Sequence, residues 1–209
     1  MSHPHWSPAW QQKDVEIKEN NLVYSGFYKL RQLNLRHRCF SGEWSEWVTR
    51  EQIRRADAAA VLLWDPKQDK IVLIEQCRMA LIGVYKNQSP WLLEIVAGLC
   101  DPGETPEETI RRESKEEAGY ELIELIPIGE FYNSPGGFAE KTYLFCGIIQ
   151  AKDTGEIHGL PQDHEDIKTH VLDAAQILKD LETGKLVTSA STLIALQWLR
   201  EKRKEKVNL

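Results

Sequence analysis

The stretch "GLCDPGETPEETIRRESKEEAGY", residues 98–120, contains the strongest indications of fold and function in this chain. Asp101-Pro102-Gly103 predicts a turn, because proline suits its second position and glycine can adopt a positive φ at its third. Thr105 can then cap a helix, and Glu108, three residues later, completes a capping box. Gly119 is a natural helix stop. The sequence therefore predicts a loop, a helix and a second loop.

Acidic side chains crowd the second half of this helix. Glu113 and Glu117 are four residues apart and share a face, and Glu116 flanks them. Negative charge is unfavourable there, by about 0.3–1 kcal/mol per side chain, because the C-terminal end of the helix dipole is itself negative. Arg112 can pair with Glu116, which leaves the other two uncompensated. A cation such as Mg²⁺ would compensate them; on spacing alone, a charged helix face in water is an equally good interpretation.

The complete pattern favours the metal. Residues 98–120 match G-x5-E-x7-R-E-U-x-E-E-x-G-U, where U is apolar, and thereby resemble the Nudix hydrolase family. All seven fixed positions are present: Gly98, Glu104, Arg112, Glu113, Glu116, Glu117 and Gly119. Two U positions depart from the pattern, since Ser114 is polar and Tyr120 is aromatic. The resemblance implies an α+β Nudix fold, an α/β/α sandwich with a mixed β-sheet.

It also implies Mg²⁺-dependent hydrolysis of a nucleoside diphosphate linked to another group. Glu113 and Glu117, with the backbone carbonyl of Ala97, would bind the metal. Arg112 would orient the carboxylates, and Glu104 would support the loop before the helix.

Within the family, the chain is similar to the bacterial ADP-ribose pyrophosphatase subgroup over residues 14–199. One stretch behind this similarity is "NSPGGFAE", which follows the Nudix pattern in the sequence. Ser134, Pro135 and Gly136 predict a rigid turn that can approach a sugar or phosphate closely, and Glu140 could accept hydrogen bonds from hydroxyls. Taken alone, the stretch is equally typical of an ordinary hairpin turn.

A second stretch is "DHEDI", residues 163–167. By resemblance, Glu165 is a further metal ligand and Asp163 occupies the position of the general base. Close relatives have glutamate at that position, so Glu165 or Glu116 could serve as the base instead. Without the family, such a run of acids is usually a solvated loop.

The third stretch is the N-terminal region, which in this subgroup swaps across a homodimer and completes the partner's substrate pocket. Tyr28 could stack on adenine, whereas packing is the favoured role of Phe27. The residues that the resemblance implies for substrate binding are Tyr28, Arg50, Glu51, Arg55, Arg78, Leu99, Ser134, Pro135, Gly136 and Glu140.

Composition limits the alternatives. With 209 residues, 42% hydrophobic and 28% charged, the chain has the character of a globular protein. No apolar run reaches the roughly 20 residues of a membrane span, and the N-terminus lacks a secretory signal, so we expect a cytoplasmic location. Four scattered cysteines indicate reduced, mostly buried thiols. The net charge of −6 argues weakly against nucleic acid as a partner.

Two domains are expected: residues 1–55, an irregular arm over 1–20 followed by antiparallel strands, and the hydrolase domain over 56–209. In the second, "AAAVLLWD" and "KIVLIEQCR" predict a buried hairpin, and "WLLEIVAG" a further strand. Helices are expected from about Ala174, with Asp173 as the N-cap, and from about Ser191.

The resulting hypothesis is hydrolysis of ADP-ribose to AMP and ribose 5-phosphate. Two or more Mg²⁺ ions, for which Mn²⁺ could substitute, would bridge the diphosphate and lower the pKa of a water, and an acidic side chain would take its proton. The alternatives are another nucleotide sugar, such as ADP-glucose, GDP-mannose or UDP-glucose, and a non-catalytic ADP-ribose sensor.

Overall fold

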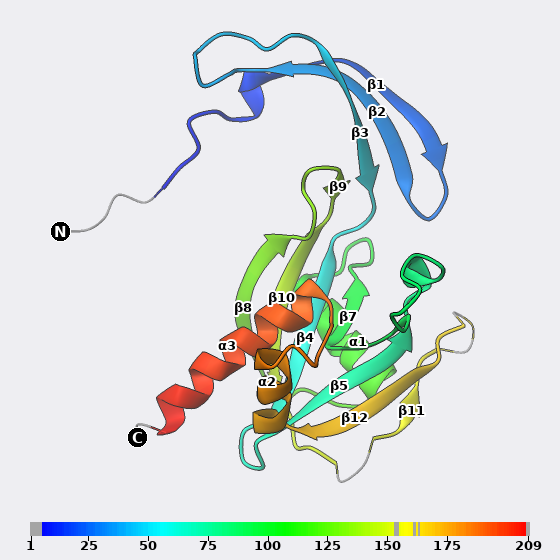
Figure 1. The fold of residues 1–209 in the computed structure, drawn as a ribbon, viewed down its shortest axis with the longest axis vertical. Coiled ribbons are helices and arrows are strands. Elements are labelled where there is room, and N and C mark those ends of the chain that lie inside the picture. Colours follow the sequence, from blue (N-terminus) through cyan, green and yellow to red (C-terminus); the bar gives the residue numbers. More distant parts are fainter. Residues whose placement is uncertain (1–5, 153–154, 161, 163, 208–209) are drawn as a thin grey trace, which may run out of the picture. The chain divides into compact units, whose positions relative to one another are not determined.

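The computed structural model describes residues 6–152, 155–160, 162 and 164–207. The chain forms two compact units (Figure 1). The first consists of Met1–Arg55 and Ser134–Glu140, and the second of Ala56–Asn133 and Lys141–Leu209. A loop between two strands of the second unit therefore belongs to the first.

The first unit is a four-stranded sheet in the order β1-β2-β3-β9. Its elements are η1 (Gln12–Asp14), β1 (Val15–Ser25), β2 (Lys29–His37), β3 (Val48–Arg54) and β9 (Phe138–Ala139). The expected antiparallel strands are present, but the expected irregular arm over 1–20 is wrong in its second part, because β1 begins at Val15. Pairing with β2 from Val15↔His37 onward supplies the backbone hydrogen bonds that extend the strand.

The second unit is a layered α/β/α domain, which confirms the expected fold class. Its elements are β4 (Ala58–Asp65), β5 (Lys70–Cys77), η2 (Met79–Leu81), β6 (Trp91–Glu94), β7 (Val96–Leu99), α1 (Pro106–Ala118), β8 (Glu124–Tyr132), β10 (Lys141–Ile148), β11 (Ile157–His158), β12 (Ile167–Asp173), α2 (Ala174–Glu182) and α3 (Ala190–Val207).

The sheet of this unit is mixed, in the order β11-β12-β5-β4-β10-β8, with β6 beside β5 and β7 beside β4. β4 and β10 run parallel, and the other pairs are antiparallel. One apolar cluster packs against α2 and α3, and a second packs against α1. Every residue of β4 is buried, as expected for a strand covered on both faces.

The segment "WLLEIVAG" forms two strands instead of the single expected strand. β6 pairs with β5, β7 pairs with β4, and Ile95 lies at the change of partner. Its amide donates to Thr192 Oγ1 of α3 at 3.0 Å, so the donor left over by the interruption is satisfied. The interruption places Glu94 at the end of one strand and Ala97 in the next.

The helix predicted between Thr105 and Gly119 is confirmed as α1. The Glu108 amide donates to Thr105 Oγ1 at 3.3 Å, and Gly119 ends the helix with φ of 68°. Ser114 is fully buried, and its hydroxyl donates to the carbonyl of Ile110 at 2.6 Å. The polar substitution in the pattern is therefore satisfied within the helix.

The four cysteines all lie among the described residues and form no disulfide. Only Cys146 is buried, whereas Cys39, Cys77 and Cys100 are partly exposed, so the expectation of mostly buried thiols is wrong. Within the described residues, no helix is long and apolar enough to span a membrane.

Candidate active site

Glu117 is the buried centre of the candidate site. It lies in the last turn of α1 with 4% of its surface exposed, and its carboxylate accepts a hydrogen bond from the Ala97 amide at 3.2 Å. Burial, reinforced by the negative charge of Glu113, raises the pKa of Glu117 to about 8. At neutral pH a carboxyl with this pKa is mostly protonated, and a positive charge beside it would favour its ionised form.

Glu113 lies one helical turn earlier on the same face. Burial also raises its pKa, against the opposing effect of Arg112. Its side chain occupies the space that a Cβ at position 98 would need, since the three atoms nearest that point belong to the Glu113 carboxylate end. A Cβ at position 98 would therefore displace the carboxylate end of Glu113, and the absence of one lets this carboxylate lie against β7.

Arg112 connects the acids of the helix to the preceding loop. Its Nη1 donates to Glu113 at 2.8 Å and to Glu116 at 3.1 Å. Its Nε and Nη2 each donate to Glu104 at 3.0 Å, and Nη2 also reaches the Leu99 carbonyl at 3.5 Å. These hydrogen bonds lower the pKa of Glu104 to about 2 and raise that of Arg112. Arg112 thus holds Glu113 and Glu116 on one side and Glu104 on the other, and its orienting role stays a prediction.

Glu165 also belongs to this neighbourhood. Its negative charge contributes to the raised pKa of both Glu113 and Glu117, and its carboxylate accepts from the Leu160 amide at 3.2 Å. Asp163, the other acid predicted in this loop, lies outside the described residues.

A divalent cation fits the chemistry of these donors. Two like-charged carboxylates, one of them buried, are hard oxygen ligands that need added positive charge. Within the described part of the chain, no three acidic, histidine or cysteine side chains already have the geometry of a metal site.

The sequence interpretation missed Glu94. Its carboxylate is buried and accepts from Arg78 Nε at 2.5 Å, and the charge of Arg78 in turn acts on the pKa of Glu117. The available signal was a single acid within the apolar run "WLLEIVAG".

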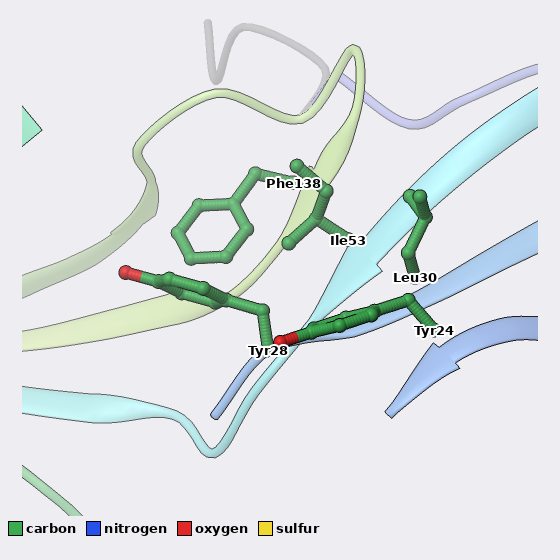
Figure 2. Close-up of a pocket in the computed structure, with 5 residues that line it drawn as sticks. All are labelled: Tyr24, Tyr28, Leu30, Ile53 and Phe138. Carbon is green, nitrogen blue, oxygen red and sulfur yellow. The ribbon is translucent and has the colours of Figure 1, made fainter. Parts of the chain in front are cut away.

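The first unit has an aromatic hollow of about 440 Å³. Figure 2 shows the side chains around it, which are Tyr24, Tyr28, Leu30, Ile53 and Phe138. Of these, sequence analysis identified Tyr28; the signal for Phe138 was an aromatic residue directly after two glycines. The Arg55 guanidinium lies 5.8 Å from the Tyr28 ring centroid and 5.4 Å from that of Phe138. Arg55 also forms an ion pair with buried Glu140.

The other substrate-binding residues predicted in this unit do not line the aromatic hollow. Strand alternation puts Glu51 on the same face of β3 as Ile53, whereas Arg50 points to the opposite face and donates to the Thr49 carbonyl. Ser134, Pro135 and Gly136 form an exposed turn, in which the Ser134 carbonyl accepts from the amides of residues 137 and 138. Phe27 is 71% exposed, so it does not pack in the core of this unit.

Three comparisons relate the chain to known proteins. The family model described as NUDIX domain matches residues 53–190. An ADP-ribose pyrophosphatase of Escherichia coli strain K12 is 42% identical over 187 residues, covering 90% of this chain and 88% of that protein. A GDP-mannose pyrophosphatase of Shigella flexneri serotype 5b is 36% identical over 151 residues, 72% of this chain and 77% of that protein.

A solved structure described as an ADP compounds hydrolase superimposes with a TM-score of 0.70 at 21% identity, covering 97% of this chain and 100% of that one. At that identity the likeness concerns the fold. It extends over both units of the chain, including β1 and β2, which lie outside the family match.

Proposed function

The chain belongs to the Nudix family, and from that premise we propose that it hydrolyses the diphosphate bond of ADP-ribose to AMP and ribose 5-phosphate. The observation behind the proposal is the pairing of Glu113 with buried Glu117 beside Ala97, at the end of a helix in the segment 98–120, which has all the fixed residues of the family pattern. Two neighbouring carboxylates lower the stability of the fold, and such perturbed groups are typical of a site that binds a cation and an anionic substrate.

In this proposal the metal is Mg²⁺, with two or more ions per site and Mn²⁺ as a substitute. The metal is held by Glu113, Glu117, Glu165 and the backbone carbonyl of Ala97. When bound, the metal neutralises the diphosphate and lowers the pKa of the attacking water. Burial of Glu117 supports its role, because a carboxylate with few water contacts gains most from a cation.

The protein side chains position the water and the substrate. An acid of the 163–167 loop, with Asp163 first and Glu165 as the alternative, accepts the proton of the water, and Glu116 is a third candidate. Arg112 keeps Glu113 and Glu116 oriented through the hydrogen bonds that tie it to Glu104. Arg78 and the backbone near Leu99 contact the diphosphate.

The first unit supplies the contacts to nucleoside and sugar. The hollow around Tyr28 is lined almost wholly by apolar side chains, which suits the face of a nucleobase, and Arg55 adds a positive charge above the rings. Arg50, Glu51 and Glu140, together with the turn Ser134-Pro135-Gly136, complete the proposed substrate contacts.

A homodimer with exchanged N-terminal units is part of this proposal, as is a cytoplasmic location. Exposed apolar side chains support the dimer: Leu22, Val23, Tyr24 and Tyr28 all lie on the surface of the first unit. Large apolar side chains exposed close together in sequence are consistent with a surface that meets a partner.

Mixing two inactive variants tests the exchange. Glu117→Gln removes a metal ligand from the second unit, and Tyr28→Ala removes a substrate contact from the first unit. Random mixing yields half heterodimers, each with one intact site, so recovery of about a quarter of wild-type activity is expected. No recovery would reject the exchange.

A substrate panel tests the proposed activity. We expect kcat/KM for ADP-ribose to exceed that for ADP-glucose, UDP-glucose and GDP-mannose. GDP-mannose is the second candidate, because a relative 36% identical to this chain is named for that substrate. A preference for GDP-mannose would retain the chemistry and change the specificity. Binding of ADP-ribose without hydrolysis of any substrate would indicate a sensor.

A further inference from the structure

Arg78 and Glu94 form an ion pair at the edge of the candidate site. Arg78 directly follows β5, and Glu94 is the last residue of β6, the strand that pairs with β5. Arg78 Nε donates to the Glu94 carboxylate at 2.5 Å. The Glu94 side chain is 5% exposed and that of Arg78 39%. The buried member of the pair therefore holds an arginine that still reaches the surface.

The sheet itself does not need an acid at this position. Glu94 lies between apolar Leu93 and Ile95, and a buried carboxylate costs free energy unless a charged partner and hydrogen bonds offset its desolvation. An apolar residue would fill the same strand position without that cost. We therefore attribute the presence of Glu94 to its ion pair with Arg78.

Both ends of Arg78 are fixed. Its amide donates to the Pro90 carbonyl at 2.8 Å, and Glu94 holds the Nε edge of its guanidinium. Within the described residues, its two terminal nitrogens make no hydrogen bond. The positive charge of Arg78 is close enough to Glu117 to oppose the rise in the pKa of that group. The guanidinium charge is thus near Glu117, while Glu94 engages only its Nε edge.

We propose that Glu94 is a positioning residue for hydrolysis: it fixes the Nε edge of Arg78 so that the terminal nitrogens are presented to a phosphate oxygen of the substrate. The inference rests on the proposed function, because the anion is the diphosphate of that substrate. A guanidinium suits this task, since its planar fork binds two oxygens together. Holding it in place beforehand removes the entropy loss of ordering it at each binding event.

A double-mutant cycle tests the inference, using Glu94→Gln, Arg78→Gln and the double variant. Glu94→Gln is expected to lower kcat/KM about tenfold, chiefly through a higher KM, because Arg78 remains but is no longer fixed. Arg78→Gln is expected to lower kcat/KM about 100-fold. The double variant should equal Arg78→Gln, since Glu94 acts only through the arginine.

Thermal unfolding separates positioning from packing. Arg78→Gln leaves a buried, unpaired carboxylate and should lower the Tm, whereas the double variant removes that charge and should regain stability. Under the proposal, activity stays low in the double variant while stability returns. If activity returned together with stability, Glu94 would be a structural residue and the inference would be overturned.

Glu75→Gln is the matched control. Glu75 lies opposite Leu93 in the same strand pair and accepts from His170 at 2.8 Å, without contact to Arg78. Its substitution should leave KM unchanged. A further loss of activity when Glu94→Gln is added to Arg78→Gln would also overturn the inference. A wild-type protein inactive on every nucleotide sugar would instead reject the proposed function, and this inference with it.

Discussion

Replacing Glu117 by Gln should make the metal-free protein more stable at alkaline pH. The folded-state pKa of Glu117 is about 8, above the ordinary glutamate value of 4.5, mainly because of burial. Between those two values the folded protein binds more protons than the unfolded chain, so stability falls as pH rises. The interval of 8 − 4.5 corresponds to about 5 kcal/mol at about 1.4 kcal/mol per pH unit. Glutamine is isosteric and does not titrate.

The assay is urea unfolding in EDTA, followed by tryptophan fluorescence at pH 5 and pH 8. From the two pKa values, the wild type should lose about 3.5 kcal/mol relative to Glu117→Gln between these pH values. Exposed Glu107→Gln, in the first turn of the same helix, is the matched control and should show no such difference. Mg²⁺ should stabilise the wild type at pH 8, because it binds the ionised carboxylate. Equal pH dependence in wild type and Glu117→Gln would mean that burial does not raise the pKa of Glu117 in the folded protein.

Three further predictions concern the support of the site. Gly98→Ala should lower kcat about 100-fold, because the new Cβ displaces the flexible end of Glu113. The free energy of unfolding should change by less than about 1 kcal/mol. Steady-state kinetics measures the first effect and urea unfolding the second. Thr192→Val should destabilise the protein by about 1–3 kcal/mol, since the Ile95 amide loses its acceptor in the core; urea unfolding measures this. Thr105→Ala should destabilise it by about 1 kcal/mol through loss of the α1 cap, visible as a lower Tm.

Each of these predictions has a contradicting result. An active Gly98→Ala variant would mean that Glu113 can take another position without loss. A Thr192→Val variant as stable as wild type would mean that the interruption between β6 and β7 is satisfied by another group. An unchanged Tm for Thr105→Ala would show that the cap contributes little, and Thr105→Ser is its control because serine retains the hydroxyl.

The features that local sequence rules describe were predictable. The turn, cap and stop of α1 depend on residues within a few positions of one another, and so does the common face of Glu113 and Glu117. The hairpin of β4 and β5 follows in the same way from two apolar runs around a turn.

Features that depend on distant pairing were not predictable. β1 begins at Val15 because β2 pairs with it, and "WLLEIVAG" divides at Ile95 because Thr192, almost 100 positions later, accepts its amide hydrogen bond. Likewise, Phe138 joins the aromatic hollow because β9 pairs with β3 from the far side of the sequence. The role of Glu94 is apparent only once its partner Arg78 is beside it.

The most direct measurement is AMP release from ADP-ribose by the wild-type protein, with Mg²⁺ and with excess EDTA, beside the Glu117→Gln variant. We expect rapid release with Mg²⁺, none with EDTA, and a loss of at least about 1,000-fold in the folded variant. Release that persists in EDTA, or near-normal turnover by Glu117→Gln, would contradict the claim that the acidic end of α1 holds the metal for this reaction.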